Sequence, residues 1–214
     1  MYFHRSPNRQ WRGFSLVELL IVISIITAMA TLLKPVISAL TAGNTRSAQV
    51  NAQSVLEGAR QFACTNRTYV RVGFAQVKNE MGTTNIAIQT LYSTTGDLRN
   101  DTSSGFDDQT SWKNTNKPIL LPQVTWDDTL VPASVTPLTS GTDFPSFTRK
   151  CGGQNVTYSM VLQFDPQGQI SLMSGKVTRS VGLGFVNPHQ PNNPVVLLLS
   201  GLSGKVQTYH REEL

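Results

Sequence analysis

Charged side chains are scarce in this chain. Lys, Arg, Asp and Glu make up 14% of its 214 residues, compared with roughly 25% in ordinary soluble domains. Ser, Thr, Asn and Gln take their place with 69 residues, a balance that is more often found outside the cytoplasm than in charge-rich cytosolic enzymes. Apolar residues still reach 39%, with 9 Phe, 5 Tyr and 3 Trp. This content argues against a disordered chain and predicts a sizeable core.

Cysteine and histidine are also rare. The two cysteines exclude a disulfide-dense mini-protein and a four-cysteine zinc module. The sequence has no Gly-x-Ser-x-Gly elbow, no His-Glu-x-x-His motif and no phosphate-binding glycine loop, so we expect no enzymatic activity and no cofactor. The three histidines are scattered along the chain: His4, His189 and His210.

Two pairs of neighbouring aspartates offer oxygen ligands of the kind that calcium prefers. They are Asp107–Asp108 and Asp127–Asp128. Neither pair belongs to a regularly spaced ligand loop, so we interpret them as solvated loop residues and expect no metal site.

The net charge of +5 and the pI near 9.4 do not indicate a protein that is basic throughout. Arg5, Arg9 and Arg12 all precede the first apolar run, and without them the net charge falls to +2. A basic surface that covers the whole protein, as in many nucleic-acid-binding domains, is therefore excluded.

The longest apolar run extends from Phe14 to Leu33 and contains one charge, Glu18. As a helix, its 20 residues would be about 30 Å long, which matches the hydrocarbon core of a bilayer. Arginines precede this run and a single Lys34 follows it. The positive-inside rule therefore predicts a cytoplasmic start, a transmembrane helix and an extracytoplasmic remainder.

Three interpretations of this run compete. It can be a conventional signal peptide, with Leu19–Ile26 as its apolar stretch and Ala28-Met29-Ala30 as its cleavage site. It can also be a plain uncleaved anchor. The third interpretation gives a use to Glu18, whose burial in a membrane costs about 2.5–3.5 kcal/mol. A cut after Gly13 would free the α-amine of Phe14 as a partner charge for that carboxylate.

The stretch from Arg12 to Val22, RGFSLVELLIV, is similar to the processing site of type IV prepilins and type II secretion pseudopilins. This resemblance implies that a prepilin peptidase cuts between Gly13 and Phe14 and methylates the new amine. It also implies that Glu18 pairs with the amine of a neighbouring pilin-like subunit in a helical filament. Pro35 stands where many pilins have a proline that interrupts the helix.

A second helical pattern follows Pro35, whose ring can kink a helix. Apolar residues recur on one face and predict a helix side that packs on a sheet. They are Ala48, Ala52, Val55, Leu56, Ala59, Phe62 and Ala63.

Patterns of period two then predict strands at Val70–Phe74, at 86–89 and in the stretch VTYSMVLQF, with further candidates at 180–186, 194–200 and 205–209. From about 94 to 153 we expect a variable insertion with one or two short strands. Asp165–Gly168 and Gly201–Gly204 have the composition of turns.

The C-terminal part adds a weaker resemblance. The order of Phe164–Gly168, Gly182–Phe185, Val195–Leu199 and Gly204–Val206 is similar to the GspH/FimT family of minor pseudopilins and minor pilins. The resemblance implies a minor pseudopilin of a type II secretion system, which acts in protein secretion. The alternatives are a minor type IV pilin with a role in pilus biogenesis or DNA uptake, and a secreted β-rich binding domain with a conventional signal peptide.

The expected fold class is α+β, with a long N-terminal helix packed on an antiparallel sheet or sandwich in a pilin-like arrangement. We expect a leader at 1–13, a transmembrane half-helix at 14–34, a soluble half-helix at 35–66 and a β-rich periplasmic domain at 67–214. This organisation predicts a single-pass protein of the bacterial inner membrane.

Two further interpretations stay open. Cys64 and Cys151 could form a disulfide in an oxidising compartment, or they could be free thiols. A few basic residues toward the C-terminus could contact DNA, but the second arginine of the Gly-Arg-x-Arg pattern of the family is missing after Gly204, and Glu212–Glu213 offset the charge. DNA binding is therefore not favoured. The residues concerned are Lys176, Arg179, Lys205, His210 and Arg211.

Overall fold

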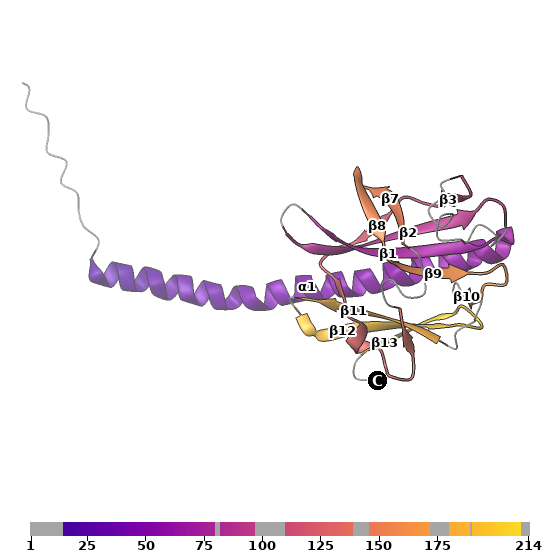
Figure 1. Ribbon diagram of the computed structural model, residues 1–214. Helices are drawn as coiled ribbons and strands as arrows, with labels where there is room; N and C mark the ends of the chain where they lie inside the picture. Colours follow the sequence, from indigo (N-terminus) through magenta and orange to yellow (C-terminus); the bar gives the residue numbers. More distant parts are fainter. Residues whose placement is uncertain are drawn as a thin grey trace, which may run out of the picture. The chain divides into compact units, whose positions relative to one another are not determined.

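The computed structural model describes residues 15–79, 82–96, 110–138, 146–171, 180–188 and 190–210, without the side chains of 32–42, 171, 190 and 210. Its elements are one helix, a short 3-10 helix and thirteen strands within these ranges (Figure 1). The chain divides into two compact units, Met1–Ala39 and Leu40–Leu214. Each unit is described by itself.

The helix α1 spans Leu16–Asn66. Ser15 precedes its first residue and Glu18 stands three positions later, which is the spacing of a capping box, with an acidic side chain near the positive end of the helix dipole. At the other end Arg67 has a φ of 49°, and the N–H of Thr68 donates to the carbonyl oxygen of Ala63 at 3.2 Å. This is the hydrogen bond of a Schellman motif, which ends the helix.

Within the described part of the chain, we find no helix that combines the length and the apolar character needed to cross a membrane. This finding corrects the predicted transmembrane half-helix at 14–34 and the predicted localisation as a single-pass inner-membrane protein.

The first sheet has the order β10-β9-β1-β2-β3, and β4 also pairs with β2. At its centre the two long strands are antiparallel, with Phe74 opposite Ile88, and β9 continues the sheet with Leu162 opposite Val72. The strands are β1 (Val70–Lys78), β2 (Thr84–Ser93), β3 (Trp112–Asn114), β4 (Ile119–Leu121), β9 (Met160–Phe164) and β10 (Ile170–Ser171).

The second sheet has the order β13-β12-β11-β5, and β6 pairs with β11 in parallel. Two further strands, β7 and β8, form a separate antiparallel hairpin. The strands are β5 (Thr125–Trp126), β6 (Thr136–Pro137), β7 (Phe147–Cys151), β8 (Gln154–Tyr158), β11 (Ser180–Asn187), β12 (Gln190–Ser200) and β13 (Val206–His210), and the 3-10 helix η1 spans Asp128–Leu130.

These strands correct the predicted fold class. We expected a membrane-anchored, pilin-like arrangement with one antiparallel sheet or sandwich and at most two short strands in the insertion. Most described elements are instead strands, divided between two sheets and a hairpin, and one pair is parallel. The expected insertion supplies β3 and β4 to the first sheet, β5 and β6 to the second, and β7 to the separate hairpin.

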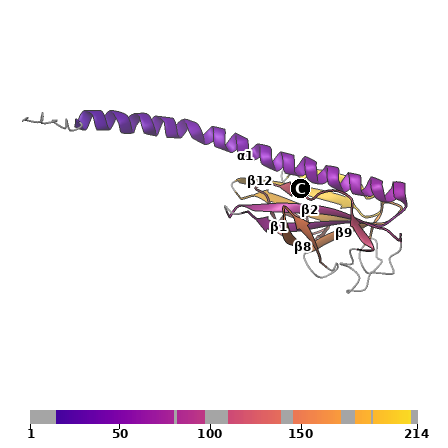
Figure 2. The same ribbon diagram turned by 90° about the horizontal axis from the view of Figure 1, so that it is seen from above.

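The core of the unit Leu40–Leu214 joins the helix to both sheets. Small and apolar side chains of α1, from Ala48 to Ala63, belong to the same buried cluster as Phe74 of β1 and Phe185 of β11. Figure 2 shows this part of α1 running along the strands. The small alanine side chains allow the helix backbone to approach the strands closely, which explains why alanines occupy most of the predicted stripe.

Candidate functional site

The described residues do not contain a metal-binding cluster of three or more His, Cys, Asp or Glu side chains. Asp127 instead caps η1, and its Oδ1 accepts hydrogen bonds from the backbone N–H and the hydroxyl of Thr129 at 3.0 and 2.6 Å. Asp165 accepts from the N–H groups of Gln167 and Gln169 in the turn between β9 and β10. These carboxylates stabilise turns. The pair Asp107–Asp108 lies outside the described residues.

Both cysteines are free thiols, so the disulfide that we considered is not formed. Cys64 is exposed near the end of α1, and Cys151 is buried at the end of β7. The thiol of Cys64 packs against the turn at Gly168, where an added β-carbon would lie 2.6 Å from its Sγ. The sequence spacing could not reveal this arrangement because it depends on how the hairpins dock on the helix.

The basic residues that we considered for DNA binding are described only in part. Lys205 is exposed in the chain that leads into β13. The side chain of His210 and the residues Lys176, Arg179 and Arg211 lie outside the described part of the chain. The structure therefore leaves their grouping as a prediction.

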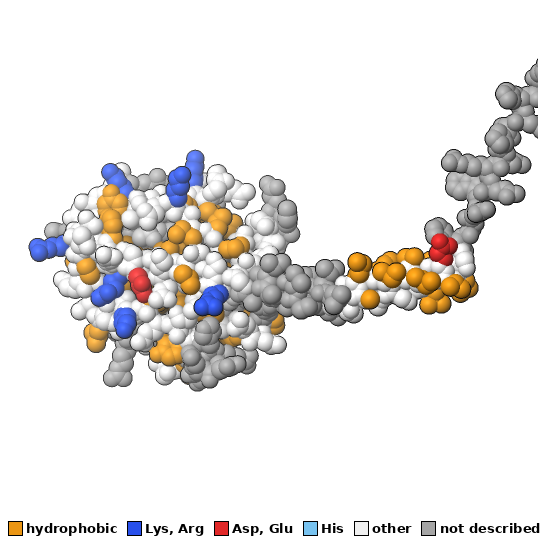
Figure 3. All heavy atoms as spheres, turned by 180° about the vertical axis from the view of Figure 1, so that it is seen from behind, with side chains coloured by type: hydrophobic (Ala, Val, Ile, Leu, Met, Phe, Trp, Pro, Cys, Tyr) orange, Lys and Arg blue, Asp and Glu red, His pale blue; other side chains and the backbone are white. Residues whose placement is uncertain are grey.

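The unit Met1–Ala39 presents an apolar helical surface. Every described side chain from Leu16 to Thr31 is exposed, and Leu16 itself is 77% exposed. In Figure 3 orange side chains gather over this part of α1. Its largest exposed side chains are Leu16, Val17, Leu19, Leu20, Ile21, Val22, Ile23, Ile25, Ile26 and Met29.

All but one of the polar side chains from Leu16 to Thr31 form hydrogen bonds with the backbone of the same helix. The hydroxyls of Ser24, Thr27 and Thr31 donate to backbone carbonyl oxygens three or four residues earlier, at 2.7–2.8 Å. Such bonds let hydroxyls lie on an apolar helix. Glu18 is the one charged side chain in this stretch. The surface therefore combines continuous apolar contact area with a single carboxylate, and we call it the apolar helix surface (Leu16–Thr31).

Two of the predicted processing residues, Gly13 and Phe14, lie outside the described residues. Pro35 lies within α1, which is assigned as helical on both sides of it. Its side chain is outside the described part, and the kink stays a prediction.

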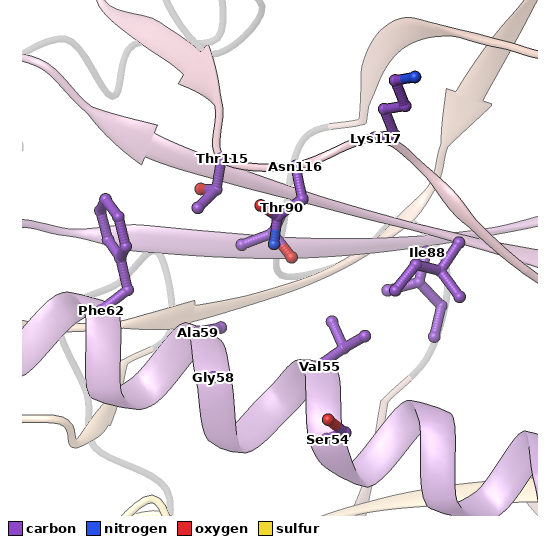
Figure 4. A pocket seen from close by; sticks show the side chains of 11 residues that line it. Ser54, Val55, Gly58, Ala59, Phe62, Ile88, Thr90, Thr115, Asn116 and Lys117 are labelled. Carbon is purple, nitrogen blue, oxygen red and sulfur yellow. The ribbon is translucent and has the colours of Figure 1, made fainter.

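A groove in the unit Leu40–Leu214 was not predicted from the sequence. It has a volume of about 380 Å³ and lies between α1 and the first sheet with its β3–β4 loop (Figure 4). Val55 and Phe62 rise from the helix toward the strands, and Asn116 points from the loop toward the helix. Its lining residues are Ser54, Val55, Gly58, Ala59, Phe62, Ile88, Thr90, Thr115, Asn116, Lys117 and Ile119.

Gly58 keeps this groove open, because no atom lies within 4 Å of the position that its β-carbon would occupy. Two residues of the β3–β4 loop, Thr115 and Lys117, are among those that line the groove, and Figure 4 shows the side chain of Lys117 extending away from α1. The Oγ1 of Thr115 is buried and has no hydrogen-bond partner among the described residues, and the ammonium-bearing side chain of Lys117 is exposed. A glycine in the middle of an otherwise regular helix was the one sequence signal that could have indicated the groove.

A buried cation lies on the other face of the first sheet's central strand. Arg71 is 1% exposed, its guanidinium carbon lies 3.7 Å from the ring centroid of Trp112, and its Nε donates to Oε1 of Gln163 at 2.8 Å. Burial lowers the pKa of Arg71 to about 9. The alternation of apolar and polar residues in β1 predicted that Arg71 lies on a polar face of the strand. In the structure the ring of Trp112 in β3 covers that face.

Comparisons with known proteins give no match: no family model, no curated protein and no solved structure is similar to this chain. The resemblance to prepilins and to the GspH/FimT family stays a prediction, based on the residues quoted for it.

Proposed function

We propose that the chain is a non-enzymatic, pilin-like assembly subunit, a minor pseudopilin whose filament or tip complex serves protein secretion by a type II secretion system. The observation that carries this proposal is the apolar helix surface with its single carboxylate, Glu18. An exposed large apolar side chain gains about 1.5–3 kcal/mol when it is fully buried. A helix with many such side chains is therefore strongly driven to associate with other apolar helices.

The charge of Glu18 determines how neighbouring helices align along their length. A cut between Gly13 and Phe14, which the prepilin resemblance implies, creates an α-amine with an ordinary pKa near 7.7–8.0. That amine is mostly protonated at neutral pH, and a neighbouring subunit can offer it to the carboxylate of Glu18. Two charges inside an apolar bundle are favourable only when they meet, so subunits that are out of register are disfavoured. The β-rich unit would supply the lateral contacts.

Replacement of Glu18 tests this role. The substitution must remove the charge of the side chain without removing its contribution to the capping box at the start of the helix. Glu and Gln both fit the third position of a capping box, so Glu18→Gln retains the helix start and removes the charge. We expect Glu18→Gln and Glu18→Ala to lower incorporation into filaments of the processed chain by about tenfold or more, which corresponds to about 1.4 kcal/mol. Glu57→Ala, which removes an exposed acid farther along α1, is the matched control. Normal incorporation of Glu18→Gln would contradict the proposal.

A second candidate is the secreted β-rich binding domain, with a conventional signal peptide that ends at Ala30. One finding supports it: the residues from Leu40 onward form a compact unit of their own. This candidate predicts a mature chain that begins at Thr31, so most of the apolar helix surface is removed. Substitutions at Glu18 would then have no effect on the mature protein, because that residue is cleaved off.

A minor type IV pilin that contacts DNA is the remaining alternative. Among the basic residues considered for DNA binding, Lys205 is the one whose side chain is described, and it is exposed. Binding to duplex DNA that weakens steeply with salt, and that is lost in Lys205→Gln, would support this role. The absence of such binding at low salt would leave the secretion role in place.

A further inference from the structure

Thr45 carries a buried hydroxyl that the continuous helix α1 leaves without a hydrogen bond. The residue is 2% exposed, and its Oγ1 has no hydrogen-bond partner among the described residues. The hydroxyls of Ser24, Thr27 and Thr31, nearer the start of the same helix, all donate to backbone carbonyl oxygens of the preceding turn. A buried polar group without a partner costs free energy. The continuous helix therefore does not explain why position 45 carries a hydroxyl.

The part of α1 that packs on the strands begins at this residue. Every described side chain from 15 to 31 is exposed, and at 43–45 Thr45 is the first that is buried. The buried stripe then continues from Ala48 to Ala63. At Gly43, by contrast, no atom lies within 4 Å of the position that a β-carbon would occupy. Packing therefore holds the helix from Thr45 onward and gives no support at Gly43.

Hydrogen bonds to the first sheet fix the start of this packed part. Nδ2 of Asn44 donates to Oε1 of Gln123 at 2.7 Å, and the backbone N–H of Gln123 donates to Oδ1 of Asn85 at 3.1 Å. Asn85 belongs to β2, and Gln123 lies in the loop between β4 and β5. The chain is thus tied to the sheet one residue before Thr45, so the preceding turn can change while the packed part stays in place.

The residues at this point are of the kind that start helices. Gly, Asn and Thr at 43–45 all have low helix propensity, and Asn and Thr are preferred N-cap residues. In the continuous helix the N–H groups of Ser47 and Ala48 donate to carbonyl oxygens four residues earlier. If the turn before Thr45 unwinds, these N–H groups lose their acceptors. The hydroxyl of Thr45 can then accept from one of them, as an N-cap residue does.

We propose that Thr45 is a built-in N-cap, and that α1 has a second state in which residues 41–44 are unwound while 45–66 stay helical and packed. The hydroxyl that has no partner in the continuous helix gains one in this state, which lowers the free energy of unwinding. A partner can then hold the residues before this turn without changing the packing of 45–66. The inference goes beyond the proposed function, because both candidate mature chains, from Phe14 and from Thr31, contain this turn.

Amide hydrogen exchange of the full-length chain, followed by mass spectrometry, tests the inference, because unwinding exposes the amides of 43–48 to solvent. Thr45→Val removes the hydroxyl and preserves the shape of the side chain. We expect these amides to exchange about fivefold more slowly in Thr45→Val, the factor that an N-cap contributes to a helix start. Its melting temperature should be retained or raised, because the continuous helix loses no hydrogen bond. Thr45→Ser, which keeps a hydroxyl, should show no such slowing.

A pair of glycines provides a second arm. Gly43→Ala should slow exchange of the same amides by about fourfold, because alanine favours the helical state over the unwound one. Gly58→Ala is the matched control. It makes the same change in the packed part of α1, where again no atom lies within 4 Å of the added β-carbon, and it should leave exchange at 43–48 within about twofold of the original chain.

Three results would overturn the inference. Unchanged exchange at 43–48 in Thr45→Val would show that the hydroxyl caps no helix start. A lower melting temperature of Thr45→Val would show that the hydroxyl stabilises the continuous helix instead. Equal slowing by Gly43→Ala and Gly58→Ala would show that the whole helix opens together. None of these results depends on Glu18, so the filament role is tested separately by Glu18→Gln.

Discussion

The ring of Phe147 lies directly on the backbone of Gly73. A β-carbon at position 73 would lie 2.6 Å from Cε1 of Phe147 and 2.9 Å from Cβ of Tyr158. The two aromatic rings stack with their centroids 5.0 Å apart, and they belong to β7 and β8. Gly73 in β1 therefore receives the hairpin, because a bare backbone leaves room for the ring of Phe147 and the Cβ of Tyr158.

Gly73→Ala should lower the free energy of unfolding by about 1–3 kcal/mol, the usual cost of overpacking a core. Urea unfolding of the variant measures this loss. Gly58→Ala, in the open part of α1, should instead be neutral or stabilising by up to about 1 kcal/mol. A smaller loss for Gly73→Ala in a Phe147→Leu background would identify the ring as the cause. Unchanged stability of the single variant would contradict this packing.

Substitution of two glycines with positive φ distinguishes the cost of steric crowding from the cost of backbone strain. Gly204 has a φ of 62° and Gly153 a φ of 88°. A β-carbon at 204 would collide with the carbonyl oxygen of Gly168 and lie 2.9 Å from Cδ of Arg60, whereas the one at 153 would meet nothing within 4 Å. Gly153→Ala should therefore cost only the strain of about 1–2 kcal/mol. Gly204→Ala should cost at least about 1 kcal/mol more, and equal melting temperatures would refute the docking of this turn on Arg60.

The raised pKa of Tyr158 predicts that the stability of the protein changes at high pH. Burial raises the pKa of its hydroxyl, and the neighbouring thiol of Cys151 adds to the effect. In the unfolded chain tyrosine ionises near pH 10, so above that pH the folded state holds a proton that the unfolded state has released. The contribution of Tyr158 to stability is complete below about pH 10 and declines as the pH rises through the folded-state pKa.

Unfolding of the original chain and of Tyr158→Phe, followed between about pH 8 and 11, isolates this effect. The difference in unfolding free energy between the two proteins should shift in favour of Tyr158→Phe as the pH rises above about 10. Below that pH the two should agree within about 1 kcal/mol, because the Oη of Tyr158 has no geometric hydrogen-bond partner among the described residues. A pH-independent difference would show that this hydroxyl ionises equally in both states.

Arg71→Lys should destabilise the protein although it preserves the charge. Lysine lacks the planar group that stacks on Trp112 and the Nε–H that bonds Gln163. Loss of a buried hydrogen bond with a charged partner costs about 1.5–3 kcal/mol. Arg67→Lys, at an exposed site, should change stability by less than about 0.5 kcal/mol. Equal effects of the two substitutions, measured by thermal unfolding, would remove the special role given to Arg71.

Local patterns predicted the parts of this fold that depend on neighbours in the sequence. The alanine stripe from Ala48 to Ala63 is buried as its period indicated. The turn at Asp165–Gly168 forms, with the N–H of Gly168 donating to the carbonyl oxygen of Asp165 at 2.8 Å and a φ of 77° at the glycine. In both cases one short segment determines its own conformation.

Features that depend on distant segments were missed. The stretch VTYSMVLQF looked like one strand, but it divides at Ser159 into β8 and β9, which belong to different sheets. Burial of Arg71 needs Trp112 of β3 and Gln163 of β9, and the groove needs both α1 and the β3–β4 loop. The pattern of residues within one segment gives no information about which distant segments pack against it.

The N-terminal residue of the mature protein tests the central claim most directly. We would isolate the protein from cells that naturally produce it and determine its first residue by mass spectrometry. The filament role predicts a chain that begins with N-methylated Phe14, which gives Glu18 its partner amine. A chain that begins at Thr31 would contradict this account, because the carboxylate and most of the apolar helix surface would then be absent from the working protein.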